Sequence, residues 1–138
     1  NKVKLKGTLR VMDEDFRIKT HEKMLAISNT IAETNSLIID FDIRKGYPCL
    51  VNDEAVTKKS IDSAKEYLGA ENVIDLPIRM TAEDFSYYSQ QVPSCFYRLG
   101  TANKSKGITH GLHTSRFNID ESSLKVGMGL MAYLAIKN

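Results

Sequence analysis

Residues 39–44 read Ile-Asp-Phe-Asp-Ile-Arg, and this alternation of apolar and charged side chains predicts a strand with one buried face. Residues 3–12 predict a second strand, interrupted by Gly7. Between the two strands, Asp13 can cap a helix over about residues 14–34. Such a β-α-β unit is half of the split ferredoxin-like pattern, and half a sandwich cannot bury its sheet alone.

A change of composition at residues 45–48, Lys-Gly-Tyr-Pro, marks a predicted domain boundary. After it, Asn52 or Asp53 can cap a second helix that runs to about Leu68. Gly69 is well placed to end this helix, because glycine readily adopts the conformation that helix ends require.

The remaining sequence predicts two short strands, a loop and a closing helix. The strands are expected at residues 73–74 and 94–99, a polar and mobile loop at residues 101–111, and the helix over about residues 121–136. Together with the β-α-β unit, these elements indicate an α/β fold, or an α+β fold for the chain taken as an isolated fragment.

Each predicted helix carries apolar residues at helical spacing, which we expect to face a core. The methionines among them are typical of core filling rather than of a cofactor site. The inward residues are Phe16, Met24, Ile27 and Ile31 in the first helix, Val56, Ile61, Ala64 and Leu68 in the second, and Leu124, Met128, Met131 and Ala135 in the last.

The composition and charge of the chain argue against two classes of binding partner, nucleic acids and membranes. The 138 residues carry a net charge of +2, with 42% hydrophobic and 26% charged residues, as is typical of a globular protein. No basic stripe interleaved with aromatic residues points to nucleic acid, and no run of about eighteen apolar residues points to a membrane span. Cys49 and Cys95 leave a disulfide open, but two buried free thiols in a reducing compartment, the cytoplasm, are the favoured interpretation.

His113 is the strongest candidate for metal chemistry. It lies in a polar loop before the closing helix, and a neutral imidazole there suits zinc and related ions. His110 lies three residues earlier, but Gly111 and the loop setting weaken a paired site. A catalytic metal needs about three protein ligands and an open position, so one histidine cannot hold it. His21 is expected to be exposed on a polar helix face.

Two further candidates are charged. Glu83 and Asp84 are adjacent, so at most one of them is expected to serve a site. The favoured alternative is an acidic helix start, with Thr81 as the cap. Arg10 ends a predicted strand and could bind a carboxylate through two hydrogen bonds, although exposed arginines on strands are common.

Several short motifs, in order along nearly the whole chain, resemble those of a family of metal-dependent amidohydrolases and peptidases. The family includes hippurate hydrolases, indole-acetyl-amino-acid hydrolases, N-acyl-diaminopimelate deacetylases and aminoacylases. The motifs are Gly7-Thr8-Leu9-Arg10, Arg44-Lys45-Gly46-Tyr47-Pro48, Val51-Asn52-Asp53, Met80-Thr81-Ala82-Glu83-Asp84-Phe85, Val92-Pro93, Phe96-Tyr97-Arg98-Leu99-Gly100 and the block from Leu112 to Glu121.

The resemblance implies a catalytic domain with two metals and an inserted lid that also dimerises. Residues 1–45 would be the second half of the ferredoxin-like lid, and residues 46–138 the C-terminal part of the catalytic domain. The general base and the other metal ligands would lie upstream, so no catalytic residue is expected in this chain. The absence of an initiator methionine before Asn1 agrees with a cut at that point.

Residue by residue, His113 matches the last metal ligand of the family. Arg10 matches the lid arginine that reaches toward the substrate carboxylate, and Asn52 and Glu83 match positions that line or support the active site. The chain departs from the family where it has Thr81-Ala82 in place of Gly-Ser and Ser115 in place of Pro, changes that could alter loop stiffness and substrate preference.

The resemblance predicts part of a hydrolase that cleaves N-acyl amino acids or related conjugates with metal-activated water. The full-length enzyme would use two divalent ions (Zn, or Mn, Co or Ni), which this chain would not hold alone, and would form a homodimer through its lid. The isolated chain is predicted to be inactive. The alternative is a non-catalytic α/β binding or dimerisation module that keeps the same scaffold.

Overall fold

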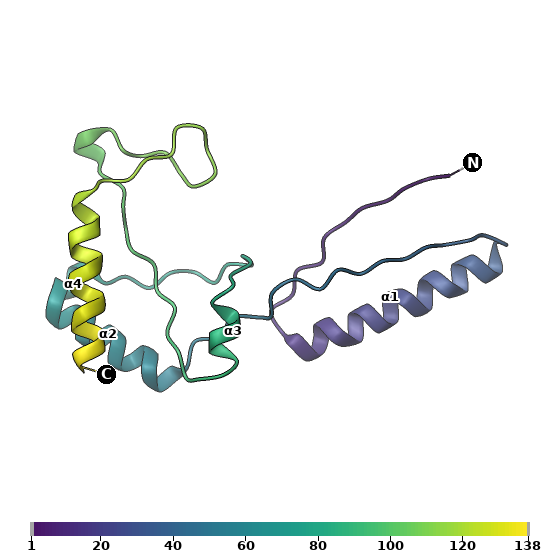
Figure 1. The fold of residues 1–138 in the computed structure, drawn as a ribbon, viewed down its shortest axis with the longest axis horizontal. Helices are drawn as coiled ribbons and strands as arrows, with labels where there is room; N and C mark the ends of the chain where they lie inside the picture. Colours follow the sequence, from purple (N-terminus) through teal and green to yellow (C-terminus); the bar gives the residue numbers. More distant parts are fainter. Residues whose placement is uncertain (1, 138) are drawn as a thin grey trace. The chain divides into compact units, whose positions relative to one another are not determined.

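The computed structural model describes residues 2–137, which fall into two units (Figure 1). Unit 1 contains the described residues up to Val51, together with Pro77–Gln91. Unit 2 contains Asn52–Leu76 and the described residues from Val92 onward. The predicted division into residues 1–45 and 46–138 concerns the domains of a larger enzyme and stays a prediction.

The long helices form where the sequence predicts them. They are α1 (Glu14–Thr34), α2 (Glu54–Leu68) and α4 (Ser122–Lys137), and a short α3 covers Ser86–Ser89. Two single 3-10 turns, η1 (Ala70–Asn72) and η2 (Lys104–Lys106), complete the helical elements of the described residues.

Side-chain caps explain where the first two long helices begin. The carboxylate of Asp13 accepts a hydrogen bond from the backbone N–H of Phe16 at 2.6 Å, and that of Asp53 accepts one from Val56 at 2.9 Å. Gly69 ends α2 with φ of 89°, a conformation that side chains with a Cβ rarely adopt. Both predicted caps and the predicted helix end are confirmed.

The predicted strands do not form a sheet. Within residues 2–137 the only bridge is an isolated antiparallel pair between Asn103 and Ile108, outside the four segments predicted as strands. The N-terminal segment and the segment after α1 are drawn in Figure 1 as extended traces without arrows. A strand requires a second backbone about 4.8 Å away, and alternation in one segment does not supply that partner. The helical part of the predicted fold class is therefore confirmed, and its sheet is not formed here.

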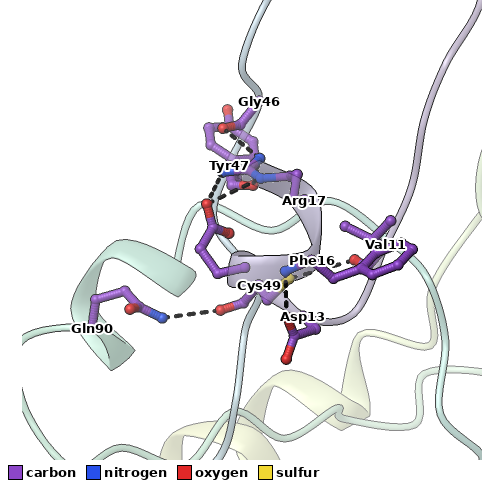
Figure 2. Close-up of polar contacts among 9 residues, drawn as sticks. Val11, Asp13, Phe16, Arg17, Gly46, Tyr47, Cys49 and Gln90 are labelled. Carbon is purple, nitrogen blue, oxygen red and sulfur yellow. Dashed lines mark hydrogen bonds and ion pairs between the residues drawn. The ribbon is translucent and has the colours of Figure 1, made fainter. Parts of the chain in front are cut away.

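In unit 1, polar contacts fasten the start of α1 to the segment that follows Arg44 (Figure 2). Arg17 donates to the backbone carbonyls of Tyr47 at 3.1 Å and Gly46 at 3.4 Å, and it forms an ion pair with Glu14. The Cys49 thiol donates to the carbonyl of Val11 at 3.4 Å. Because this thiol is partly desolvated and lies near Glu14, its pKa is raised.

The apolar stripe of α1 is not buried as predicted. Phe16, Ile27 and Ile31 are 58%, 50% and 46% exposed, and only Met24 of the predicted set is half-buried. The spacing defines the correct face of the helix, but burial requires an opposing surface, which the described residues do not provide. His21, predicted to be exposed, is half-buried, and its Nδ1 atom is buried without a hydrogen bond.

In unit 2, α2 packs against α4 through a close approach at Gly129. A Cβ built on Gly129 would lie 2.0 Å from the Tyr67 hydroxyl oxygen. The Tyr67 and Tyr133 rings pack against each other with centroids 5.2 Å apart and planes tilted by 31°. Lys137 donates to both carboxylate oxygens of Glu66 at 3.1 Å.

The buried face of α4 differs from the predicted one. Leu130 is the one buried hydrophobic residue among those described, at 4% exposed, whereas Met128 and Met131 are 69% and 64% exposed and Leu124 is 50% exposed. Gly129 allows Tyr67 of α2 to approach α4 closely, and the buried Leu130 is its neighbour in sequence. The four residues predicted to face inward in α2 are half-buried.

Two expectations from composition can be compared with the structure. Cys49 and Cys95 are both free thiols, half-buried rather than fully buried. Among the described helices, none has both the length and the apolar character needed to cross a bilayer.

The contact at Gly129 predicts an unusual response to alanine. Gly129→Ala should gain about 1 kcal/mol of helix propensity but lose about 1–3 kcal/mol through overpacking against Tyr67, so a net loss in the free energy of unfolding is expected. In a Tyr67→Phe background, which lacks the hydroxyl, the same change should be less destabilising, because the closest remaining ring atom, Cζ, lies 3.0 Å from the added Cβ. Urea unfolding followed by circular dichroism measures both. Equal effects in the two backgrounds would contradict the assigned contact.

Candidate functional site

His113 lies in an exposed turn of unit 2 with an uncommon backbone conformation. Its φ is 62°, in the left-handed region, where few residues other than glycine are found. Two hydrogen bonds brace the turn: the Thr114 hydroxyl donates to the carbonyl of Gly111 at 2.9 Å, and the N–H of Phe117 donates to the carbonyl of Thr114 at 3.1 Å. The His113 imidazole is therefore carried on a hydrogen-bonded turn and is accessible to a metal ion.

The loop before His113, expected to be mobile, contains a hydrogen-bonded turn. Asn103 and Ile108 exchange two backbone hydrogen bonds, at 2.8 and 2.9 Å, around the turn of η2. The Asn103 side chain also accepts hydrogen bonds from the N–H groups of Ser105 and Lys106. Gly107 ends the turn with φ of 69°.

Asp120 joins this loop to the start of α4. Its carboxylate accepts hydrogen bonds from the Asn103 amide at 2.5 Å, from the Lys106 ammonium at 2.7 Å and from the N–H of Ser122 at 3.2 Å. Its own N–H donates to the carbonyl of Thr101 at 2.9 Å. The hydrogen bond from Lys106, followed by that from Asn103, holds the pKa of Asp120 well below its usual value.

Asn52 serves a structural role through both ends of its amide. Its Oδ1 accepts from the N–H of Phe96 at 2.8 Å, and its Nδ2 donates to the carbonyl of Phe96 at 3.0 Å. The N–H of Asp53 donates to the carbonyl of Ser94 at 2.9 Å. The Asn52 side chain thus mimics one rung of a β-ladder and holds residues 94–96 against the start of α2.

The other two predicted site residues lie in unit 1. Arg10 is exposed. Glu83 is half-buried and precedes α3, where its carboxylate accepts from the N–H of Phe85 at 3.4 Å and its carbonyl accepts from the N–H of Ser86 at 3.2 Å. Helix α3 begins at Ser86, so the predicted helix start capped by Thr81 is displaced toward the C-terminus. The four predicted site residues are thus divided equally between the units, Asn52 and His113 belonging to unit 2.

The described residues do not assemble a complete metal site. No group of three or more His, Cys, Asp or Glu side chains among residues 2–137 is arranged to hold an ion. The exposed imidazole of His113 fits the role of a single ligand, and His110 is half-buried in the segment before it.

The sequence analysis missed the cluster of Asn103, Lys106 and Asp120. A local signal existed for parts of it, because Asn103 followed by Gly107 is typical of a turn and Asp120 directly precedes a helix. No local pattern indicates that these side chains meet, since Asn103 and Asp120 are 17 residues apart.

The two hydrogen bonds between Asn52 and the Phe96 backbone predict a loss of stability when the Asn52 donor is removed. Asn52→Asp would set a carboxylate oxygen against the Phe96 carbonyl, and we expect unit 2 to lose about 1–3 kcal/mol of stability in denaturant unfolding. Asn118→Asp is a matched control, because the Asn118 side chain acts as an acceptor for the N–H of Ile119 at 2.9 Å, a role that aspartate retains. Similar losses in both variants would contradict the pairing.

The lowered pKa of Asp120 predicts a pH dependence of stability. Because the folded pKa lies below the unfolded value of about 3.9, the stabilisation is complete well above that value and is lost as the pH falls through and below it. The difference in stability between the unmodified chain and Asp120→Asn should be constant above about pH 5 and shrink toward pH 2. A difference independent of pH would show that the charge of Asp120 has no stabilising role.

Comparison with known proteins identifies the family. The model of the Peptidase family M20/M25/M40 matches residues 5–137. "Thermostable carboxypeptidase 2" of Saccharolobus solfataricus is 33% identical over 96% of this chain and 33% of its own length. The Bacillus subtilis protein named "Putative amidohydrolase YhaA" is 30% identical over 94% of this chain and 33% of its own length.

A third relative, "Uncharacterized hydrolase SERP0968" of Staphylococcus epidermidis, is 35% identical over 87% of this chain and 31% of its own length. The chain thus spans about a third of the length of the curated relatives it matches. No solved structure matches it significantly. The match over nearly every described residue shows that this chain belongs to the Peptidase family M20/M25/M40.

Proposed function

We propose that this chain forms the C-terminal part of a metal-dependent amidohydrolase that releases amino acids from N-acyl conjugates. The observation that carries the proposal is the family match over residues 5–137 of a chain that spans a third of its relatives' length. The printed names of two relatives, carboxypeptidase and amidohydrolase, both denote hydrolysis of amide bonds. The exposed apolar face of α1 is compatible with further polypeptide packing on it.

Each predicted site residue has a proposed role. His113 supplies one imidazole ligand from its braced turn, and Arg10 on the lid binds the substrate carboxylate. Asn52 and Glu83 support the walls of the site through their hydrogen bonds to Phe96 and Phe85. Two divalent ions, when bound, would activate water and polarise the amide carbonyl. The general base and the remaining ligands belong to polypeptide outside this chain.

The proposal includes the cell compartment and the assembly. The free thiols of Cys49 and Cys95 suit a reducing compartment, and we place the enzyme in the cytoplasm. We also propose a homodimer formed through the lid, in which the apolar segments on either side of α1 take part in pairing. The substrate is a small molecule.

The proposal predicts that the 138-residue chain is inactive alone. With added Zn²⁺ or Mn²⁺ it should not hydrolyse hippurate or an N-acetyl amino acid above the rate without protein, because one ligand cannot hold a catalytic metal. In the longer enzyme, His113→Ala should lower kcat/KM by at least about 100-fold, the upper range for losing even an outer partner of a ligand. His110→Ala is the matched control and should retain activity.

A colorimetric assay for the released amino acid measures the activity of the 138-residue chain and of the variants of the longer enzyme. Metal-stimulated hydrolysis by the 138-residue chain would contradict the fragment assignment. Unchanged metal dependence in the longer protein carrying His113→Ala would contradict the ligand assignment. Absence of hydrolysis in the unmodified longer protein would favour a non-catalytic module with the same scaffold.

A further inference from the structure

The turn that carries His113 belongs to a loop closed at its base. One closure is the backbone pair between Asn103 and Ile108, and the other is the hydrogen bond from the N–H of Asp120 to the carbonyl of Thr101. Residues 109–119 therefore leave and return beside the same short segment, residues 101–103. Fixing both ends of a loop reduces the conformations available to its tip.

Side chains reinforce this base from within. The Asp120 carboxylate is 9% exposed, and both of its oxygens are occupied: Oδ2 by the Asn103 amide, and Oδ1 by Lys106 and the N–H of Ser122. The opposite side of the Asn103 amide holds the turn of η2. One buried carboxylate thus joins the preceding loop, the returning end of the His113 loop and the first turn of α4.

The arrangement uses both oxygens of the Asp120 carboxylate as acceptors. A neutral amide in its place could not accept hydrogen bonds at both positions, because one of its two ends is a donor. That donor would face either the Asn103 amide or the Lys106 ammonium, which are themselves donors. The Asp120 side chain is the buried member of its pair with Lys106, which is 56% exposed, so the cost of the change arises from unsatisfied hydrogen bonds at position 120.

The tip of the loop needs such support. His113 has a left-handed φ of 62°, and a residue other than glycine keeps this conformation only where the surrounding structure fixes it. A metal ligand must also be held within about 0.5 Å of its productive position. The braces at Gly111 and Thr114 act within the turn, and the base at Asp120 fixes the ends of the loop that contains them.

We propose that Asp120, through Asn103 and Lys106, is a positioning residue that holds the His113 loop in its metal-binding conformation. The role rests on the proposed function of His113 as a ligand. Asp120 touches neither metal nor substrate in this role, and it acts by restricting where the imidazole can lie.

The first test is amide hydrogen exchange on the 138-residue chain, with Asp120→Asn and Lys106→Met as variants. We expect exchange to quicken at least about tenfold at Asp120 and also at Phe117, whose bond to Thr114 braces the turn. Lys137→Met is the matched control, because it removes the exposed ion pair with Glu66 in the same unit. Faster exchange at Asp120 with an unchanged exchange rate at Phe117 would overturn the proposal, because loosening the base of the loop would then have no effect on the turn that carries His113.

The second test uses the longer enzyme and measures activity against the free Zn²⁺ concentration. Asp120→Asn should raise the zinc concentration for half-maximal activity about tenfold, with activity restored by excess zinc, whereas Lys137→Met should change neither. A lower maximal activity without a shift in zinc dependence would overturn the positioning role. If His113→Ala leaves zinc dependence unchanged, the ligand assignment fails and the positioning role fails with it. If His113→Ala abolishes activity and Asp120→Asn behaves as the control, only the positioning role fails.

Discussion

Most large apolar side chains of the described residues are exposed to solvent. The local structure therefore depends mainly on polar contacts. Leu130 is the single buried hydrophobic residue among them, whereas Ser60, Ser63, Ser86 and Asp120 are buried polar ones. Burial of apolar surface usually provides the main stabilisation of a fold. Here, helix caps, turns and small clusters of hydrogen-bonded charged groups define the local structure.

Two of these clusters are more than ordinary surface ion pairs. Arg17 in unit 1 is 15% exposed and Asp120 in unit 2 is 9% exposed, and each bonds to backbone groups as well as to an opposite charge. By contrast, Arg44 and Asp42 form a pair at 93% and 72% exposure, of a kind that contributes about 0–1 kcal/mol. Partial burial strengthens the electrostatic attraction and also raises the cost of breaking it. The two clusters, each with one largely buried member, therefore fix the segments that they join.

What the sequence predicted well was local. The ends of α1 and α2 follow from Asp13, Asp53 and Gly69, because a cap is made by residues three or four positions apart. The strands and the buried helix faces were not predictable in the same way, because each requires a partner distant in sequence. Of the candidate site, His113 and Asn52 were indicated by family motifs. The cluster at Asp120 was missed because its side chains come from residues 14 and 17 positions apart.

A metal ligand that lies far in sequence from the other ligands of its site must be held in place by its own loop. If the loop were free, metal binding would have to supply the entropy lost on ordering it, at about 1–2 kcal/mol for each residue fixed. If the loop is already ordered, this entropy is not lost on metal binding, and the affinity for the metal is higher. The hydrogen bonds at Asp120, Asn103 and Thr101 join the two ends of the His113 loop through residues of unit 2 alone. The proposed positioning role of Asp120 follows from this constraint, because a residue that fixes the base of a loop restricts the loop's tip without touching the imidazole.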